Sequence, residues 1–534
     1  MKKQDLNPFN RVLVETPDRN TFDLSFDNKL TLDMGNLYPV LVQETLPGDN
    51  FHITPEMLIR FAPMTFPIMH RIDATIHFFY VPNRILWKNW TKFLAMEKVA
   101  GVPYSPLYIQ GTTEEPLNVE VGSIYDYLGL PIDTNIKEKI NAFPLLAFLK
   151  IYNEYYQDQN NDSYFQLFRD TLEAIYDKSG GRIAPSELML DEHDYDQLDL
   201  LQRAWQHDYF TSALPFAQKG DAVNIPLELE SLAGPVRVAQ AFNFNTTDPA
   251  ADGSLDIDSS FLSSSGSPFQ AIELQGMATF DGSDAVLSGT INQLRAAMQL
   301  QKFLELNARS GTRYNELIRA HFGEDIGDAR INRPEYIGGI KNNVMISEIL
   351  QTSSTTESSA LGEYAGNANA IVSGDTMHFS CPEHGFIIGI LSVVPRTAYS
   401  QGINRKYTRQ DALDYYWSHF AHIGEQAILN KELYYNSALS DNDGTFGYIP
   451  RYSEYKYNAS EVHGDFRTNL EDFHLARKFS NRPNLSEEFI YVNPEEQKRI
   501  FAIQQEDVNS LYAHIYFDMQ AQRKIPFFTN PGGL

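Results

Sequence analysis

The chain has 534 residues, 43% of them hydrophobic and 13% aromatic, so it can bury a large core and is not disordered as a whole. Its formal net charge of −26 argues against a protein that wraps nucleic acid unaided, because binding phosphates requires Lys and Arg. It has neither an apolar run of about 18 residues nor an apolar N-terminal signal segment, and its single cysteine, Cys381, excludes an intrachain disulfide. We therefore expect no membrane partner and folding in a reducing cytoplasm.

Extended segments dominate the N-terminal part of the chain. Alternating side chains from Phe22 to Leu32 indicate an edge strand or hairpin, and Leu37 to Phe51 indicates a strand that ends at the turn Pro47 to Asp49. The prolines of Phe61 to Pro67 require an extended or looped backbone. From Arg71 to Val81, apolar side chains occupy one face of a strand and polar ones the other.

The segment from Phe386 to Val394 contains no charge, and only Gly389 and Ser392 interrupt its apolar side chains. Its short length and its Ile and Val content predict a central strand that is buried on both faces. The expected partner is the strand from Arg71 to Val81, roughly 300 residues earlier. If both belong to one core, the chain between them consists of insertions or further strands of the same sheets.

Helical spacing begins after Pro82. Trp87 and Trp90 indicate a first helix, and Phe143 to Tyr156 carries an apolar face at i, i+4, i+7 and i+11. We interpret residues 83–220 as a helical and looped insertion on the β core. The acidic run from Glu187 to Leu200 is typical of a solvated face.

A long polar excursion follows. Residues 243–290 are rich in Ser, Gly, Asp, Asn and Thr and contain no Lys or Arg, which indicates an exposed loop that is functional or disordered. A capping box of Thr290 and Gln293 predicts a helix where the excursion returns. A second helix is expected from Thr312 to Phe322, with Gly323 as its stop.

Strand and loop patterns fill the rest of the chain. We expect Tyr336 to Leu350 to be extended, the polar run Gln351 to Asn369 to be a loop, and Asp411 to Tyr435 to be partly helical. A last strand is expected within Asn509 to Phe528. No internal repeat is present.

Enzyme motifs are absent: there is no Gly-Lys-Ser/Thr phosphate loop, dinucleotide fingerprint, serine-hydrolase elbow or His-Glu-x-x-His. Three weaker patterns resemble metal sites, namely Cys381 with His384, the trio His419, His422 and Glu425, and the loop Asp441 to Gly444. Packing explains the first two better, because no second cysteine exists and aromatic residues flank the trio, and a tight turn explains the third. We expect no cofactor and no metal.

Tyr452, Tyr455 and Tyr457 lie beside Arg451 and Lys456, a combination with which single-strand binders stack unpaired bases. Packing in the core or between subunits is the alternative, and we favour it because tyrosine is common in both places.

Six long, irregular blocks carry a resemblance to a known family: GNLYPVLVQETLPGDNFHI, RFAPMTFPIMHRIDATIHFFYVPNRILW, RAWQHDYFTSALPFAQKG, LNARSGTRYNELIRAHFG, RPEYIGGI and CPEHGFIIGILSVVPRTAYSQGINR. They resemble the major capsid protein of the Microviridae, small tailless bacteriophages with single-stranded DNA, in the gokushovirus-type branch. The resemblance extends from about residue 5 to the end of the chain.

The resemblance implies a mainly β fold, an eight-stranded antiparallel jelly-roll sandwich with large, partly helical loop insertions, formed by residues 1–534 as one capsid domain. It implies a structural protein and not an enzyme, which self-assembles as about 60 copies into a T=1 icosahedral shell around a circular single-stranded DNA genome. The expected locations are the virion and, before assembly, the host cytoplasm.

The resemblance also implies partners. A small basic DNA-packaging protein accompanies the genome in this family, which suits an acidic subunit. A pilot or spike-type minor virion protein and a bacterial host surface receptor are expected as well. Positive charge near the two termini is the candidate DNA-facing charge inside the shell: Lys2, Lys3, Arg11, Arg523 and Lys524.

Residues 228–289 depart from the family's pattern. In gokushovirus-type capsids a variable insertion near this place forms the protrusion at the three-fold axes, and we assign residues 228–289 to it, with host attachment as the role of the exposed loops. The competing interpretation is a β-sandwich protein that binds or processes glycans, because jelly rolls and aromatic surfaces also serve that purpose.

Overall fold

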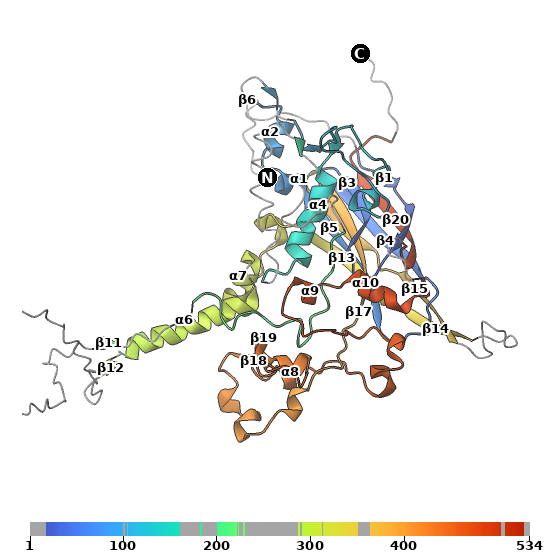
Figure 1. Cartoon of the computed structure of the whole chain (residues 1–534). Helices are drawn as coiled ribbons and strands as arrows, with labels where there is room; N and C mark the ends of the chain where they lie inside the picture. The colour runs from blue at the N-terminus through green and yellow to red at the C-terminus, as the bar shows by residue number, and fades with distance from the viewer. Residues whose placement is uncertain are drawn as a thin grey trace, which may run out of the picture. The chain divides into compact units, whose positions relative to one another are not determined.

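The computed structural model describes residues 18–99, 102–103, 105–160, 182–183, 200–221, 223, 228–229, 287–288, 291–311, 313–350, 364–503 and 508–527. Contacts divide the chain into two units, residues 1–219 with 304–534 and residues 220–303. The first unit is built on two large antiparallel sheets, which lie against each other as a β sandwich (Figure 1).

The larger sheet has seven strands. Its central pair is β4 (Asp49–Phe61) with β20 (Leu511–Arg523). The other edge of β20 pairs with β1 (Asn20–Asp23) and β2 (Phe26–Leu32), and the other edge of β4 pairs with β15 (Tyr364–Ser373) and β16 (Met377–Cys381), while β14 (Met345–Leu350) lies outside β15. The predicted strands within residues 22–32 and 509–528 are confirmed.

The second sheet has four strands in the order β13-β5-β17-β3, namely Glu335–Asn343, Ile72–Pro82, Gly385–Pro395 and Tyr38–Thr45. Strand β17 pairs directly with β5, with Ile388 opposite Phe79. The predicted pairing of these segments, far apart in sequence, is therefore confirmed. The extended segment predicted at residues 336–350 is confirmed as β13 and β14.

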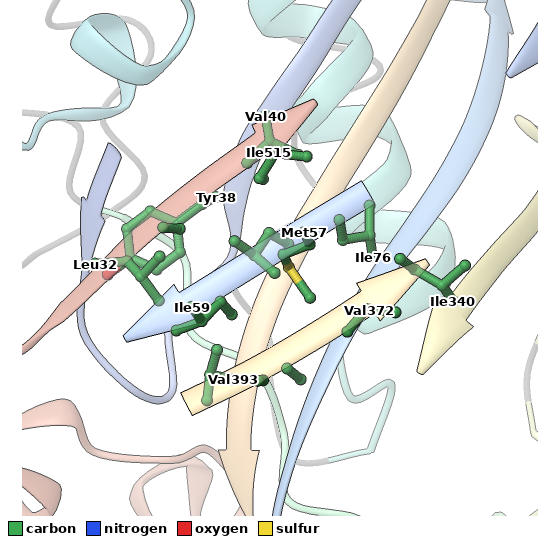
Figure 2. Close-up of a cluster of buried hydrophobic side chains, with 14 of the residues drawn as sticks. Leu32, Tyr38, Val40, Met57, Ile59, Ile76, Ile340, Val372, Val393 and Ile515 are labelled. Atoms are coloured by element: carbon green, nitrogen blue, oxygen red, sulfur yellow. The ribbon is translucent and has the colours of Figure 1, made fainter. Parts of the chain in front are cut away.

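Every residue of β17 is buried, because both of its faces are covered. On one face, Ile387, Leu391 and Val393 enter the core between the two sheets. Figure 2 shows this core, where Met57 and Ile59 of the larger sheet approach Ile76 and Val393 of the smaller one. On the other face, Phe386, Ile388 and Ile390 join a second cluster that includes helix α4.

Helices of the predicted insertion pack on that second face. They are α1 (Asn83–Leu86), α2 (Trp90–Leu94), α3 (Ile124–Tyr127) and α4 (Phe143–Ile151), which continues as a π-helix (Tyr152–Tyr156). Short strand pairs accompany them: β6 (Lys98–Val99), β7 (Val102–Pro103), β8 (Tyr108–Ile109), β9 (Ile140–Asn141) and β10 (Arg182–Ile183). The helix predicted from Phe143 to Tyr156 is confirmed, whereas the segment with Trp87 and Trp90 forms two short helices, α1 and α2, with the extended Trp87 between them. Within the described residues, no helix is long and apolar enough to cross a lipid bilayer.

In the second unit, β11 (Glu228–Leu229) pairs antiparallel with β12 (Leu287–Ser288). Helix α6 (Ile291–Ser310), of which residues 291–303 belong to this unit, begins at the residue that the sequence predicts. The rest of the polar excursion, residues 230–286, lies outside the described residues. Helix α7 (Tyr314–Phe322) ends at Gly323, whose left-handed φ of 71° confirms the predicted stop.

The prediction of a loop over residues 351–369 is wrong at its end, because β15 begins at Tyr364. Ala368 and Ala370 alternate into the core there, and small residues in a polar run hid this alternation.

The prediction that residues 411–435 are partly helical is confirmed by short 3-10 turns and α8 (Asn430–Leu433), beside the hairpin β18 (Glu425–Leu429) and β19 (Thr445–Pro450). The remaining short helices are α9 (Glu487–Ile490), α10 (Pro494–Gln497) and 3-10 turns at Asp328–Ile331, Arg405–Tyr407, Ala412–Asp414, Ser418–Phe420, Ser453–Tyr455, Gly464–Arg467, Glu471–Phe473 and Lys498–Ile500.

Candidate nucleic-acid interface

Arg523, at the end of β20, is the candidate DNA-facing cation with the most contacts in the structure. Its Nε lies 3.1 Å from Oδ2 of Asp49, and its Nη2 donates a hydrogen bond of 2.9 Å to the carbonyl oxygen of Glu44. Asp49 is buried, so Arg523 neutralises a carboxylate of the fold. The neighbouring Lys524 is exposed.

The other three candidate cations, Lys2, Lys3 and Arg11, lie outside the described residues. Whether any of the five cations faces a genome stays a prediction.

The three candidate stacking tyrosines have different surroundings. Tyr452 is only 4% exposed and its ring is enclosed, with Tyr416 at 4.9 Å between centroids and the Arg451 guanidinium 5.0 Å from its centroid. It therefore has no free face for a base. Tyr455 and Tyr457 are 49% and 42% exposed, so the stacking prediction rests on these two.

Tyr455 and Tyr457 line a cleft of about 510 Å³ together with several cations, including Arg405, Lys406, Arg409 and Arg467. The Arg409 guanidinium lies 4.4 Å from the centroid of the Tyr455 ring, and its Nη2 lies 3.5 Å from Oε1 of Glu454. Flat aromatic faces beside guanidinium groups suit a planar ring linked to an anion, which is the chemistry of a nucleotide.

Glu432 closes the floor of this cleft. Its carboxylate accepts hydrogen bonds from Oη of Tyr209 at 3.0 Å, Nη1 of Arg405 at 3.3 Å and the backbone N of Leu429 at 3.0 Å. Burial raises the pKa of Glu432, and the nearby charge of Arg405 opposes that shift. The floor is thus a satisfied network that holds Arg405 in place.

The sequence analysis missed Arg405 and Arg409. A signal for them exists, because Arg405, Lys406 and Arg409 surround Tyr407 in the same aromatic and cationic pattern as residues 451–457. Tyr209 and Glu432 carried no such signal, since 223 residues separate them.

The three weak metal patterns adopt ordinary structural roles. Cys381 is buried and free, and the His384 ring lies 6.0 Å from that of Trp90. Glu425 pairs with Arg309, and His419 lies in a 3-10 turn, so the trio shares no helix. Asp441 accepts from Gly444 N in a turn and pairs with Arg482 at 3.1 Å.

Over the residues that the structure describes, no group of three His, Cys, Asp or Glu side chains is placed to hold a metal ion. The acidic run at residues 187–199 lies outside those residues.

Comparison with known proteins gives a match over nearly the whole chain. The family described as capsid protein (F protein) matches residues 11–533. The chain is 34% identical to capsid protein VP1 of Chlamydia phage 1, over 98% of this chain and 97% of that protein. It is 35% identical to capsid protein VP1 of Bdellovibrio phage phiMH2K, over 94% and 92%, and 26% identical to capsid protein VP1 of Spiroplasma virus 4, over 94% and 92%.

Proposed function

The chain belongs to the capsid protein (F protein) family, and from this premise we propose that it builds a T=1 icosahedral shell of about 60 copies around a circular single-stranded DNA genome. It is a structural major capsid protein of the Microviridae type and not an enzyme, and it self-assembles into the shell of a virion. The family match over residues 11–533 carries the proposal. We assign the chain to the gokushovirus-type branch.

We propose an eight-stranded jelly roll as the capsid domain, with residues 83–220 as an insertion. β1 and β2 count as one strand, as do β15 and β16, while β14 is an additional edge strand paired to β15, so the order is 1-8-3-6 in one sheet and 2-7-4-5 in the other. Strands adjacent in sequence thus alternate between the two sheets for most of the chain. That order supports two interlocked Greek keys, the arrangement of a jelly roll.

The acidity of the subunit supports a separate counter-charge for the genome. A chain of net charge −26 repels phosphates, so we propose that a small basic DNA-packaging protein neutralises most of the DNA. Within the subunit, Lys2, Lys3, Arg11, Arg523 and Lys524 are proposed to face the interior. Of these five cations, Arg523 mainly neutralises the carboxylate of Asp49, with which it pairs.

We propose that the cleft beside Tyr455 and Tyr457 stacks bases of the packaged strand. Its exposed rings and guanidinium groups support this role. Particles of a Tyr455→Ala and Tyr457→Ala double variant are expected to contain the genome with fewer ordered nucleotides at this cleft by electron cryomicroscopy. Tyr314→Ala, at a 62% exposed residue outside the cleft, is the matched control. Unchanged density at the cleft in the double variant contradicts the role.

Residues 228–289 are proposed to form the exposed protrusion at the three-fold axes and to attach the particle to a bacterial surface receptor, with a pilot or spike-type minor protein completing the virion. The pairing of β11 with β12 supports an excursion that leaves and returns at one place. Replacing residues 230–286 by a short Gly-Ser linker is expected to preserve shells and to abolish adsorption to the host. Normal adsorption of such particles contradicts the attachment role.

Assembly of the purified chain tests the central proposal. Negative-stain microscopy and light scattering of the purified chain are expected to show shells of uniform size. In the host, we propose that the subunits collect in the cytoplasm before assembly. A chain that stays monomeric or forms only small oligomers under all conditions contradicts the icosahedral shell and favours the glycan-binding alternative.

A further inference from the structure

A cavity of about 970 Å³ lies against the face of the four-stranded sheet on which α4 packs. Asp73, Thr75 and His77 of β5 line it, because they alternate with the residues of β5 that enter the core between the two sheets. The end of the π-helix, residues 203–214 and residues 308–316 complete its wall. A cavity of this volume is large enough for a small ligand.

Positive charge gathers around one carboxylate of this cavity. Oδ2 of Asp73 lies 3.0 Å from Nζ of Lys341 and 3.2 Å from Nε of Arg396. Its Oδ1 lies 3.4 Å from Nε of Arg71. One carboxylate neutralises only one of these three cations, so the cluster keeps a surplus of positive charge. Because Lys341 and Arg396 contact the same oxygen atom, their nitrogen atoms are close enough to bind one further anion together.

Arg203 adds a guanidinium group to the lining of the cavity. Its Nη1 donates a hydrogen bond to the hydroxyl oxygen of Ser392, and its Cζ lies 6.0 Å from the centroid of the Tyr156 ring. It forms no ion pair with any residue that the structure describes. Burial lowers the pKa of Arg203, as expected for a cation that leaves water without an anionic partner. An anion in the cavity would therefore stabilise this charge.

Strand register brings Arg203 and Lys341 to the same part of the sheet. Lys341 of β13 lies opposite Thr75 of β5. Ser392 of β17 lies opposite Thr75 on the other side, and it accepts the hydrogen bond from Arg203. Burial, and next the positive charges of Arg203 and Lys341, lower the pKa of His77 to about 4. The cavity therefore has a positive region beside Thr75 and His77.

The other charged residues that the structure places in the lining do not cancel this positive region. Arg309 pairs with Glu425, and Nη1 of Arg313 lies 3.4 Å from Oε1 of Glu316. Asp158 is the remaining carboxylate, and its Oδ1 already accepts a hydrogen bond of 2.9 Å from the backbone. In a chain of net charge −26, a local surplus of positive charge suits an anionic ligand.

We propose that this basic cavity binds a phosphate group, which Lys341, Arg396 and Arg203 hold. Guanidinium and ammonium groups around one point match the several acceptor oxygens of a phosphate. Tyr336 is 48% exposed at the wall of the cavity and offers a flat face to a base attached to that phosphate. The phosphate belongs either to single-stranded DNA, in which case the inference rests on the proposed function, or to a free nucleotide.

Calorimetric titration of the purified chain tests the site, with inorganic phosphate, thymidine monophosphate and an oligothymidylate of about ten nucleotides as probes. Lys341→Gln removes one cation at a 47% exposed side chain of an edge strand, so the fold is expected to persist. We expect it to weaken phosphate binding about tenfold. Arg203→Gln is expected to weaken it at least as much. Lys137→Gln, at an exposed lysine outside the cavity, is the matched control and is expected to bind like wild type.

Asp73→Asn is expected to have the opposite effect. It removes the carboxylate that competes with the ligand for Lys341 and Arg396, so phosphate is expected to bind about tenfold more tightly. A purely structural role of the cluster predicts no such gain. Because this variant also loses its ion pairs, its melting temperature is expected to fall without phosphate and to rise again as phosphate is added.

The oligothymidylate distinguishes the two sources of the phosphate. If the ligand is a DNA strand, the oligothymidylate binds more tightly than thymidine monophosphate, and Lys341→Gln reduces the slope of log affinity against log salt by about 0.7. If the ligand is a free nucleotide, the oligothymidylate binds no more tightly than the monophosphate. The Tyr455→Ala and Tyr457→Ala double variant, which alters the aromatic cleft, is expected to leave the binding of inorganic phosphate unchanged.

The inference is wrong if none of the three probes binds, or if Lys341→Gln and Lys137→Gln bind inorganic phosphate equally. It is also wrong if an oligoglutamate peptide binds and no phosphate probe does, because the cavity then selects carboxylates. Failure of the chain to form shells contradicts the proposed function instead, and the titration with inorganic phosphate then decides the inference alone.

Discussion

The Nδ1 atom of His77 lies 2.8 Å from the hydroxyl oxygen of Tyr156, which connects strand β5 of the four-stranded sheet to the π-helical end of α4. The two residues are 79 positions apart in sequence. Their rings also stack at 6.0 Å between centroids. The contact therefore fixes an inserted helix to the sandwich through a titratable side chain.

This contact predicts acid sensitivity of the fold. Burial lowers the pKa of His77 to about 4, from about 6.5 in an unfolded chain. As pH falls from about 6.5 to about 4, the unfolded chain binds a proton that the folded chain does not, so stability falls by roughly 3 kcal/mol. Urea unfolding followed by tryptophan fluorescence at pH 7.0 and 4.5 measures the loss.

His77→Gln is expected to reduce this loss without abolishing it, because burial also lowers the pKa of His70 to about 4. His70→Gln is the matched control and is expected to reduce it by a similar amount. Equal losses in wild type and in both variants show that neither histidine is buried as described.

The network under the aromatic cleft predicts a large loss of stability for Glu432→Ala. The change removes three hydrogen bonds and leaves the partly buried Arg405 without its nearest carboxylate, which costs about 3 to 5 kcal/mol. Urea unfolding of the unassembled subunit measures it. Glu461→Ala, which breaks the exposed pair with Lys406 at 3.7 Å, is the control and is expected to change stability by less than about 1 kcal/mol.

The local sequence pattern was enough to predict elements whose adjacent residues in sequence permit only one conformation. The uncharged run of β17 requires cover on both faces, and Gly323 provides the left-handed residue that ends α7. The Glu432 network is different, because the packing of distant segments brings Tyr209 and Arg405 to one carboxylate. No local residue spacing predicts that Tyr209, Arg405 and Glu432 come into contact.

The candidate nucleic-acid interface also combines residues that the sequence predicts with contacts that it does not predict. Tyr455 and Tyr457 were predicted from their neighbours in sequence, whereas the enclosure of Tyr452 depends on Tyr416, which reaches it from another loop. On the face of the seven-stranded sheet that points away from the core, the alternation that exposes Tyr512 and Tyr516 is readable in the sequence. Their alignment with Arg60 and Glu56 is not, because it depends on the register between β20 and β4.

Cys381 provides a probe of the folded state. It is 1% exposed, and burial raises the pKa of its thiol to about 12. Because the thiolate is the reactive form, a thiol reagent at pH 8 is expected to modify the folded chain at least about a thousandfold more slowly than the chain in urea. Equal rates in the two states contradict burial of β16 against β4.

The close approach of β17 to β5 predicts a strong effect of Gly385→Ala. A Cβ at residue 385 would lie 2.4 Å from the carbonyl oxygen of Val81 and 3.0 Å from Cα of Pro82, both backbone atoms that no side-chain rotation can move. We expect a loss of about 2 to 3 kcal/mol in urea unfolding of the subunit. Gly327→Ala is the control, because its φ is −57° and a Cβ there meets nothing within 4 Å, so stability is expected to stay equal or rise slightly. Equal effects of the two substitutions contradict the pairing of β17 with β5.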